Sequence, residues 1–346
     1  MSRSILAGAL FAAVSLSLGC ATAPRTAPAP AQVPAATTQE CAWVTSYGAD
    51  DVCGVAVPSG ATLGCIRTGA KPHGIAVSRD GARVYVSNEG ANSLSVVDAT
   101  GRRVVAEVPV GQTPNQLALT PDGSHVWVLN NAQASISVVN TASNALERTI
   151  PSGRGPHIIV TNRARNIAVV TSEGDSSLEV LDLASYERVA HVPAYAWPRV
   201  LAVTNDGMTA FLTIRWLNGA LVVGLGGDGP RGRIALGEPR FAPEGKDAHG
   251  IALTPDGSEL LITTQMTGQL TFVDPRTLEV RGQLTVGRNP NWVEVTSDGR
   301  FAVVSNTDDD SVSIVELQAR RVVATAQVGR QPKRLAVGQC PPGRSP

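Results

Sequence analysis

Residues 71–81 read KPHGIAVSRDG, and TPNQLALTPDG at 113–123 and DAHGIALTPDG at 247–257 repeat the same pattern. A proline recurs at one position of this pattern every 42 residues, at Pro72, Pro114, Pro156 and Pro198, and again at Pro290 and Pro332. Ala248 takes the proline position of one further copy, 42 residues before Pro290. A fixed period of this length indicates a repeat architecture, in which each copy is one structural unit that packs against the next.

Each copy has the pattern of four short strands. In the first copy, HGIAVS at 73–78 is followed by an Asp-Gly pair, and then by RVYVSN at 83–88, SLSVVD at 93–98 and RVVAEVPV at 103–110. Period-two alternation of apolar residues indicates strands, and Asp-Gly between two such runs indicates a hairpin turn. A repeat of about 40 residues with four strands is typical of a β-propeller blade.

The two ends of the chain are expected to complete one blade together. Seven proline-type positions predict seven blades, but only one strand can follow Pro332. Shifting the first copy back by 42 residues places its second and third strands on residues 42–55. We therefore predict an all-β fold, a single seven-bladed propeller over residues 41–343, in which residues 42–69 supply three strands of the closing blade. Closing the ring removes exposed sheet edges.

The repeat also resembles a known family. RVYVSNEGANSLSVVD at 83–98, with VGxxP between copies and Asp-Gly in the first hairpin, is similar to the YVTN-type β-propeller repeat, and the likeness covers nearly all of residues 42–338. The resemblance implies a seven-bladed propeller of the kind found in bacterial exported proteins and archaeal surface proteins. Because the roles of that family are diverse, it implies the fold far more firmly than the function.

The N-terminus has the features of an export signal. Arg3 precedes an apolar stretch at residues 5–18, and LSLGC ending at Cys20 resembles a bacterial lipobox. We therefore expect a signal peptide at 1–19, a lipid on Cys20 and a Pro/Ala-rich tether over 20–40, with no other membrane attachment. The expected location is the cell envelope, at the outer membrane facing the periplasm. Ordinary signal-peptidase cleavage after Ala23 is the alternative.

Four further cysteines are expected to form two disulfides. In repeat coordinates, Cys41 and Cys340 lie at the two ends of the first hairpin turn, which is missing from the closing blade. A bond between them would replace the missing chain connection. Cys53 and Cys65 fall on the third and fourth strands of the same blade, where they can face each other. Disulfides are typical of exported proteins; buried free thiols are the alternative.

Composition and motifs exclude several classes of function. The 346-residue chain has 29 basic and 29 acidic residues, so it lacks the basic surplus of nucleic-acid binders. It contains no G-x-S-x-G, H-E-x-x-H, P-loop or C-x-x-C-H motif. We therefore predict no catalytic residue, no cofactor and no nucleic-acid partner, and we expect a monomer.

One position of the repeat varies in a way that indicates a binding site. The residue directly after the proline position begins the innermost strand, and it is polar in every copy. These seven residues, here called the mouth ring, are His73, Asn115, His157, Arg199, His249, Asn291 and Lys333. We expect them to face one end of the channel and bind a polar or anionic small ligand, or an envelope protein. The alternative is that the positions are solvent-exposed and merely tolerate polar residues.

Loops at the same end could add to this site. An insertion of eight residues falls between Gly237 and Ala248, and we expect residues 238–247 to form a lid or specificity element. Three aromatic residues near this end are expected to act as rim anchors: Trp197, Phe241 and Trp292.

The leading functional hypothesis is a non-catalytic recognition scaffold, and two alternatives remain. One is a lactonase-like hydrolase, for which Glu238, Glu244 and Asp247 are the carboxylates expected near the ring. The other is a metal or redox-cofactor site built from the ring histidines. No metal ligand is predicted, because the histidines lie in alternate blades and strand spacing separates their backbones by more than about 10 Å. A buried carboxylate within hydrogen-bond reach of a ring histidine would favour catalysis.

Overall fold

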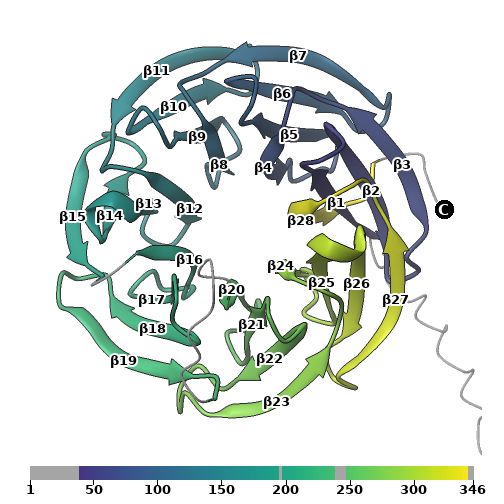
Figure 1. Ribbon diagram of the computed structural model, residues 1–346. Coiled ribbons are helices and arrows are strands. Elements are labelled where there is room, and N and C mark those ends of the chain that lie inside the picture. The colour runs from purple at the N-terminus through teal and green to yellow at the C-terminus, as the bar shows by residue number, and fades with distance from the viewer. Residues whose placement is uncertain (1–38, 195–196, 238–246, 342–346) are drawn as a thin grey trace, which may run out of the picture. The chain divides into compact units, whose positions relative to one another are not determined.

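The predicted propeller is the fold of this protein. The computed structural model describes residues 39–194, 197–237 and 247–341, and within these ranges 28 strands form seven four-stranded antiparallel sheets. Figure 1 shows the sheets as blades of a ring, with the first strand of each blade at the centre and the fourth at the outside. The predicted fold class is therefore confirmed.

The blades follow the repeat along the chain. Blades one to three comprise β4 Pro72–Val77, β5 Arg83–Asn88, β6 Ser93–Asp98 and β7 Arg103–Pro109; β8 Pro114–Leu119, β9 His125–Asn130, β10 Ser135–Asn140 and β11 Ala145–Pro151; and β12 Pro156–Asn162, β13 Ile167–Ser172, β14 Ser177–Asp182 and β15 Arg188–Pro193. Blades four to six comprise β16 Pro198–Val203, β17 Thr209–Ile214, β18 Gly219–Gly224 and β19 Gly229–Ala235; β20 Ala248–Leu253, β21 Leu260–Thr264, β22 Gln269–Val273 and β23 Val280–Thr285; and β24 Pro290–Val295, β25 Phe301–Asn306, β26 Ser311–Glu316 and β27 Arg321–Gln327. Two short 3₁₀ turns, η1 Glu173–Asp175 and η3 Thr307–Asp309, follow β13 and β25.

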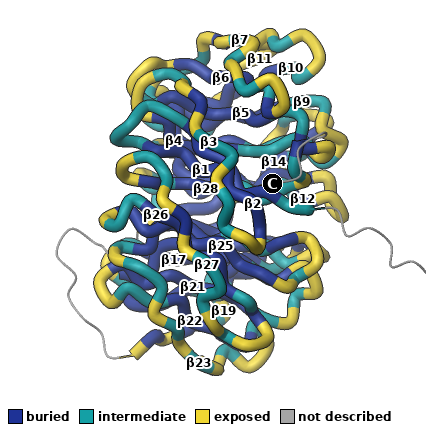
Figure 2. The backbone as a smooth tube through the Cα atoms, turned by 90° about the vertical axis from the view of Figure 1, so that its right-hand side faces the viewer, coloured by how far each residue is buried: buried dark blue, intermediate teal, exposed yellow. Residues whose placement is uncertain are grey.

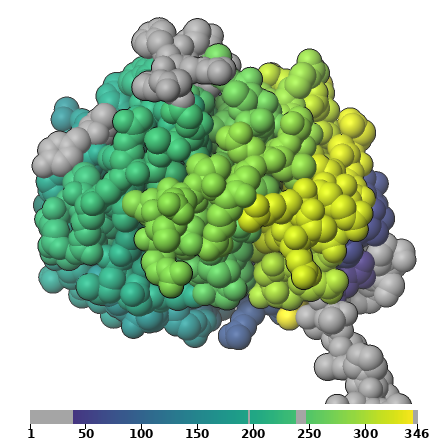
Figure 3. All heavy atoms as spheres, turned by 90° about the horizontal axis from the view of Figure 1, so that it is seen from below, coloured from purple at the N-terminus to yellow at the C-terminus, as the bar shows by residue number. Residues whose placement is uncertain are grey.

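The closing blade is assembled from both ends of the chain, as predicted. Its strands are β28 Pro332–Gln339, β1 Glu40–Ser46, β2 Asp51–Val57 and β3 Thr62–Arg67, in that order across the sheet. Cys41 and Cys340 form a disulfide with a Cα–Cα distance of 4.9 Å. Figure 3 shows the yellow residues of blade six next to the blue and purple residues of the closing blade. The predicted bond thus covalently joins the first strand of this blade to the second.

The core lies between neighbouring blades. The second and third strands are buried along almost their whole length, whereas the outer strand β7 alternates between exposed and half-buried residues. Leu94 and Val96 of blade one share one apolar cluster with Val126 and Val128 of blade two. Figure 2 shows this distribution, with buried backbone inside each blade and exposed residues concentrated in loops and outer strands. Because the second and third strands bury both faces, nearly all of their residues lie in the core, and polar residues at these positions are buried as well.

Two recurring features of the sequence have structural reasons. Asn88, fully buried at the end of β5, donates through its side-chain amide to the hydroxyls of Ser93 and Ser95. A Cβ on Gly69 would lie 2.6 Å from the Asn88 side chain, so the recurring glycine is needed for a close approach. At the opposite end of the blade, Gly81 closes the Asp-Gly turn with φ 71°.

Candidate functional site

The mouth ring is held by hydrogen bonds between blades. Among the described residues, five second-strand hydroxyls donate to the ring carbonyl of the following blade. These bonds are Thr45 to His73, Ser87 to Asn115, Thr171 to Arg199, Thr213 to His249 and Ser305 to Lys333, at 2.8–3.2 Å. The backbone of each of these ring residues is therefore fixed by the preceding blade.

Two of the ring histidines are followed by a glycine, which allows the imidazole to reach a backbone carbonyl of the next blade. A Cβ on Gly74 would lie 2.5 Å from the Asn115 carbonyl oxygen, and one on Gly250 would lie 2.9 Å from the Asn291 carbonyl oxygen. This close approach brings His73 Nδ1 to 3.3 Å and His249 Nδ1 to 2.7 Å from those same carbonyls. His157, which is followed by an isoleucine, has no hydrogen-bond partner at Nδ1.

The three ring histidines are neutral. A backbone carbonyl can only accept, so His73 and His249 carry their proton on Nδ1 and leave Nε2 as an acceptor. Burial, and then the positive charge of Arg334, hold the pKa of His73, His157 and His249 well below the ordinary value. The positive charge at the mouth therefore comes from arginine and lysine side chains.

A second ring of side chains lies beside the first and was missed in the sequence. In six blades, the residue 16 positions after the mouth-ring residue donates its backbone N–H, at 3.0–3.1 Å, to the carbonyl two residues before that same mouth-ring residue. In the closing blade, Tyr47 at the other end of the chain donates in the same way to the carbonyl two residues before Lys333. The members of this second ring are Tyr47, Glu89, Asn131, Glu173, Arg215, Gln265 and Thr307. The signal was present, because counting 16 residues on from each of the first six ring positions gives a polar residue.

The second ring brings two carboxylates to the ring histidines. Glu89 lies 3.9 Å from His73 Nδ1, and Glu173 lies 3.9 Å from His157 Nδ1 and 3.6 Å from Arg199. Burial raises the pKa of Glu173, and the charges of Arg199, Arg215 and Arg334 oppose this rise. The expectation that no carboxylate other than Glu238, Glu244 or Asp247 approaches the ring is therefore wrong. The two distances between a carboxylate and an imidazole, 3.9 Å each, are too long for hydrogen bonds.

Arg334 is the most unusual charge at the mouth. It follows Lys333 on β28, is 1% exposed, and its guanidinium carbon lies 4.2 Å from the centre of the Trp292 ring. Its Nη1 donates to Asn291 Oδ1 at 3.3 Å, and its Nε has no hydrogen-bond partner. No carboxylate of the described residues lies within ion-pair distance of it. Burial, and then the charge of Arg199, lower the pKa of Arg334 to about 9, against the opposing charges of Glu173 and Glu89.

The residues of the two rings, taken with Arg334, carry a positive surplus. The two rings and Arg334 contribute four cations, Arg199, Arg215, Lys333 and Arg334, and two carboxylates, Glu89 and Glu173, which leaves a net charge of +2. Lys333 lies over the Tyr47 ring at 5.5 Å. Burial and the neighbouring Glu89 raise the pKa of Tyr47 to about 12, so its hydroxyl stays protonated.

Several predicted site residues differ from expectation. Exposed ring positions were the alternative to a binding role, but the structure buries His73, Asn115, His157, His249 and Asn291 to 9% exposure or less, and half-buries Arg199 and Lys333. Trp292 is not a rim anchor. It is 6% exposed, packs under Arg334 and donates through Nε1 to Glu294 at 2.9 Å, because its position on β24 points into the interior.

The rim beside blade four contains an exposed aromatic pair. Trp197 is 43% and Trp216 42% exposed, and their ring centres lie 5.4 Å apart. The guanidinium of Arg215 lies over both rings. Phe241 and nearly all of the predicted lid, residues 238–246, lie outside the described residues, while Asp247 is 3% exposed.

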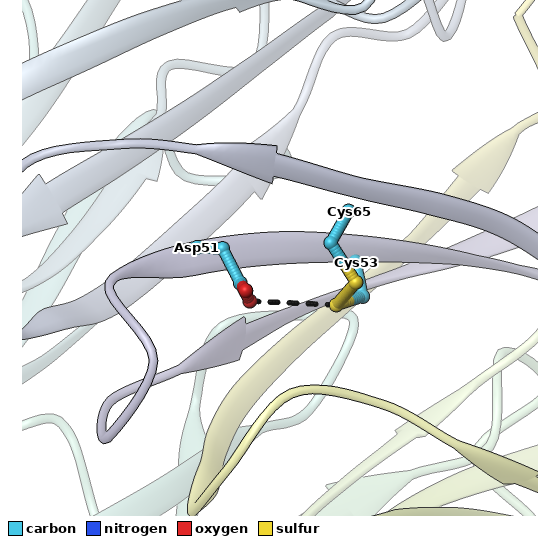
Figure 4. Close-up of side chains that lie close together, drawn as sticks. All are labelled: Asp51, Cys53 and Cys65. Atoms are coloured by element: carbon cyan, nitrogen blue, oxygen red, sulfur yellow. Dashed lines mark hydrogen bonds between the residues drawn. A yellow bond between two sulfur atoms is a disulfide. The ribbon is translucent and has the colours of Figure 1, made fainter.

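One group of potential metal ligands lies away from the mouth. Asp51, Cys53 and Cys65 have ligand atoms within 4.8 Å of one another, and they are the one such trio found in the described part of the chain. Figure 4 shows that Cys53 and Cys65 are joined as a disulfide, with Asp51 beside the Cys53 sulfur. A disulfide has no thiolate to offer a metal ion, so this trio is the second predicted disulfide and a neighbouring carboxylate.

Surface pockets also form between the loops of neighbouring blades. One of about 530 Å³ lies between blades five and six at the end of the propeller that carries the mouth, and it is lined by residues including Met266, Arg288 and Asp309. Another, of about 620 Å³, lies at the opposite end among the Asp-Gly turns of Asp256 and Asp298. Neither is lined by a residue of the mouth ring.

Comparison with known proteins supports the propeller. The sequence of residues 10–164 matches the model of the YNCE-like β-propeller family. No curated protein matches the chain.

Solved structures resemble the chain at low identity. Hydrazine synthase of Kuenenia stuttgartiensis has 21% identity and a TM-score of 0.70 over 79% of this chain and 91% of its own. The periplasmic gluconolactonase of Pseudomonas aeruginosa has 21% identity and a TM-score of 0.67 over 88% and 100%. A functionally unknown protein of Desulfotomaculum acetoxidans has 12% identity and a TM-score of 0.73 over 86% and 99%.

At these identities the likeness establishes the fold alone, because the same fold hosts unrelated functions. The family match and the seven closed blades agree with each other and with the repeat read from the sequence. The chain is therefore a seven-bladed β-propeller, and its residues 10–164 match the model of the YNCE-like β-propeller family.

Proposed function

We propose that this protein is a recognition scaffold of the cell envelope that binds an anionic ligand at the channel mouth without reacting with it. The observation that carries the proposal is Arg334, a fully buried guanidinium with no carboxylate of the described residues in ion-pair distance and with Nε unpartnered. A buried charge without a counterion is costly. A bound anion would supply the counterion, and Arg199 lies close enough to act on the same charge.

The hydrogen-bonding groups around Arg334 suit a ligand that carries hydroxyls as well as an anionic group. Neutral histidines present Nε2 acceptors, and the Glu173 carboxylate is an acceptor whose Oε1 has no hydrogen-bond partner. Cations that can bind the anionic group therefore lie beside acceptors that can bind the hydroxyls. A few such polar groups at fixed positions set the orientation of a bound ligand.

Titration calorimetry with D-gluconate and inorganic phosphate tests this function. We expect binding to the wild type, and we expect Arg199→Gln to weaken it at least tenfold, because the variant removes one cation from the mouth. Arg79→Gln is the matched control, since it removes an exposed charge from an Asp-Gly turn at the opposite end. Equal losses in the two variants would mean that only the overall charge matters and would contradict a site at the mouth.

The proposal includes attachment to a membrane through Cys20, which lies outside the described residues. Within the described ranges, no helix is long and apolar enough to span a bilayer. We expect the mature protein to begin at Cys20, to carry a lipid by mass spectrometry, and to partition into detergent. A Cys20→Ala form should be left unprocessed or lose the detergent partitioning; normal processing together with unchanged membrane fractionation would contradict lipidation.

Lactone hydrolysis is the second candidate, favoured by the carboxylates beside ring histidines and by the fold of the gluconolactonase described above. Each carboxylate lies 3.9 Å from the imidazole of its neighbouring histidine, which is too far for the hydrogen bond that would orient a general base. Hydrolysis of D-glucono-1,5-lactone above its spontaneous rate, lost in Glu173→Gln, would establish this candidate and replace the scaffold. Arg79→Gln again serves as the control.

A further inference from the structure

The exposed aromatic pair beside blade four is arranged as a platform. The indole rings of Trp197 and Trp216 have centres 5.4 Å apart and planes tilted by 59°. The guanidinium carbon of Arg215 lies 5.0 Å from the first ring centre and 4.6 Å from the second. These three residues are here called the rim platform. Each indole is more than 40% exposed, which is unusual for a side chain that stabilises proteins chiefly by burial.

The backbone holds the platform at some energetic cost. Arg215 N–H donates to the Trp197 carbonyl at 3.0 Å, and Leu217 N–H donates to the Ile214 carbonyl at 3.1 Å, which closes a turn. Within that turn Trp216 has φ 64°, a left-handed conformation that bulky residues rarely adopt and that strains the backbone. The residues at this repeat position in the first and third blades, Gly90 and Gly174, do not have a positive φ, so the left-handed conformation of Trp216 is particular to blade four. A tryptophan kept in a strained conformation at the surface points to a binding role.

Unsatisfied polar atoms connect the platform with the channel mouth. His157 is 5% exposed and its Nδ1 has no hydrogen-bond partner. Three other buried atoms also lack a partner: Glu173 Oε1, Arg199 Nε and Arg215 Nε. Glu173 lies 3.6 Å from Arg199 and 3.9 Å from His157, and it interacts with the charge of Arg215. Buried polar atoms are rarely left unpaired, so this group indicates a ligand with both donors and acceptors.

We propose that the rim platform is a saccharide subsite, which stacks one sugar ring of an acidic saccharide whose carboxylate lies at the neighbouring arginines of the mouth. This inference rests on the proposed anion-binding function and names its ligand class. The sugar hydroxyls donate to Glu173, and the apolar C–H face of the ring packs on the exposed indole surface. The negative face of an aromatic ring attracts such C–H groups.

The geometry favours a sugar over a planar aromatic ligand. A planar ring held between two others needs van der Waals gaps of about 3.5 Å on each side, or about 7 Å between parallel ring centres. The two indoles are closer than this and are tilted, with Arg215 already lying over both. They therefore offer outward surfaces for one-sided packing, and they leave no slot for a nucleobase.

Calorimetry with three purified probes tests the subsite. The probes are tri-galacturonate, D-galacturonate and maltotriose, of which the last has sugar rings and no carboxylate. We expect the trimer to bind at least tenfold more tightly than the monomer, and maltotriose to bind at least tenfold more weakly than the trimer. The variant Trp197→Ala/Trp216→Ala should reduce the affinity for the trimer about tenfold and leave that for the monomer unchanged.

Met266→Ala is the matched control, because Met266 is 55% exposed and occupies the repeat position of Trp216 in blade five. It should bind all three probes as the wild type does, and both variants should keep the wild-type melting temperature. A trimer that binds no tighter than the monomer, or that is insensitive to the tryptophan variant, overturns the subsite and leaves anion binding standing. If neither acid binds and D-gluconate and phosphate also fail, the proposed function itself is overturned.

Discussion

Removing the disulfide that closes the ring, in Cys41→Ser/Cys340→Ser, is expected to lower the free energy of unfolding by about 5–6 kcal/mol as an upper bound. The two cysteines are 299 residues apart, so the bond shortens nearly the whole unfolded chain, and the loop-entropy relation gives this value. Since a typical domain has about 5–15 kcal/mol of stability, the change is large. Urea unfolding followed by tryptophan fluorescence measures it.

The second disulfide supplies the matched control. Cys53 and Cys65 are 12 residues apart in the same blade, and the same relation predicts a loss of about 3 kcal/mol for Cys53→Ser/Cys65→Ser. The variant that lacks the ring-closing disulfide should therefore be the less stable of the two. Limited proteolysis should cut this variant first in β1 or β28. Equal losses, or a larger loss in the control, would show that ring closure depends on strand pairing and packing between β28 and β1 rather than on the covalent bond.

Replacing the buried arginine, in Arg334→Met, is expected to abolish anion binding and to stabilise the ligand-free protein. The variant removes a charge that has no carboxylate partner in the described structure, and a methionine can still pack on Trp292. Substituting apolar residues for buried charges commonly stabilises by about 1–4 kcal/mol, which corresponds to a rise in melting temperature of roughly 2–6 °C for a domain of this size. Affinity for D-gluconate should fall at least 100-fold.

The pH dependence of the wild type provides a separate check on Arg334. Its folded pKa of about 9 is below the ordinary value of an arginine, so the unfolded chain binds this proton more tightly than the folded one. This buried charge therefore destabilises the folded state most below pH 9 and less as the pH rises above 9, and anion binding is expected to weaken over the same range. Arg334→Met should lose both effects. A melting temperature below that of the wild type, together with unchanged D-gluconate affinity, would contradict the assigned role.

The blade and its order around the ring could be predicted from the sequence. The 42-residue spacing, the alternating strands and the Asp-Gly turns each report on contacts between residues close together in the chain, and local contacts leave local patterns. The closing blade also followed from the register. Shifting the first copy back by 42 residues placed Cys41 and Cys53 at repeat positions whose neighbours in the blade the four-strand pattern predicts. The pairings of Cys41 with Cys340 and of Cys53 with Cys65 are those of the structure.

The candidate site could be predicted only in part. The mouth ring was found because its members share one repeat position. How far these residues are buried could not be predicted, because burial at the axis depends on how closely the seven innermost strands approach one another. That approach is set by contacts between blades, such as Gly74 against the Asn115 backbone, and such contacts have no signature in a single strand.

What the sequence by itself determined was the seven-bladed ring, its closure by the two ends of the chain, and the positions that lie at one end of the channel. Only the tertiary structure decided that Glu173 meets His157, that Trp292 is buried and that Arg334 reaches the mouth. The physical reason is that neighbouring residues on a strand point to opposite faces. A shift of one residue, from Lys333 to Arg334, thus changes which blade the side chain meets, and this direction becomes defined only when the ring has closed around it.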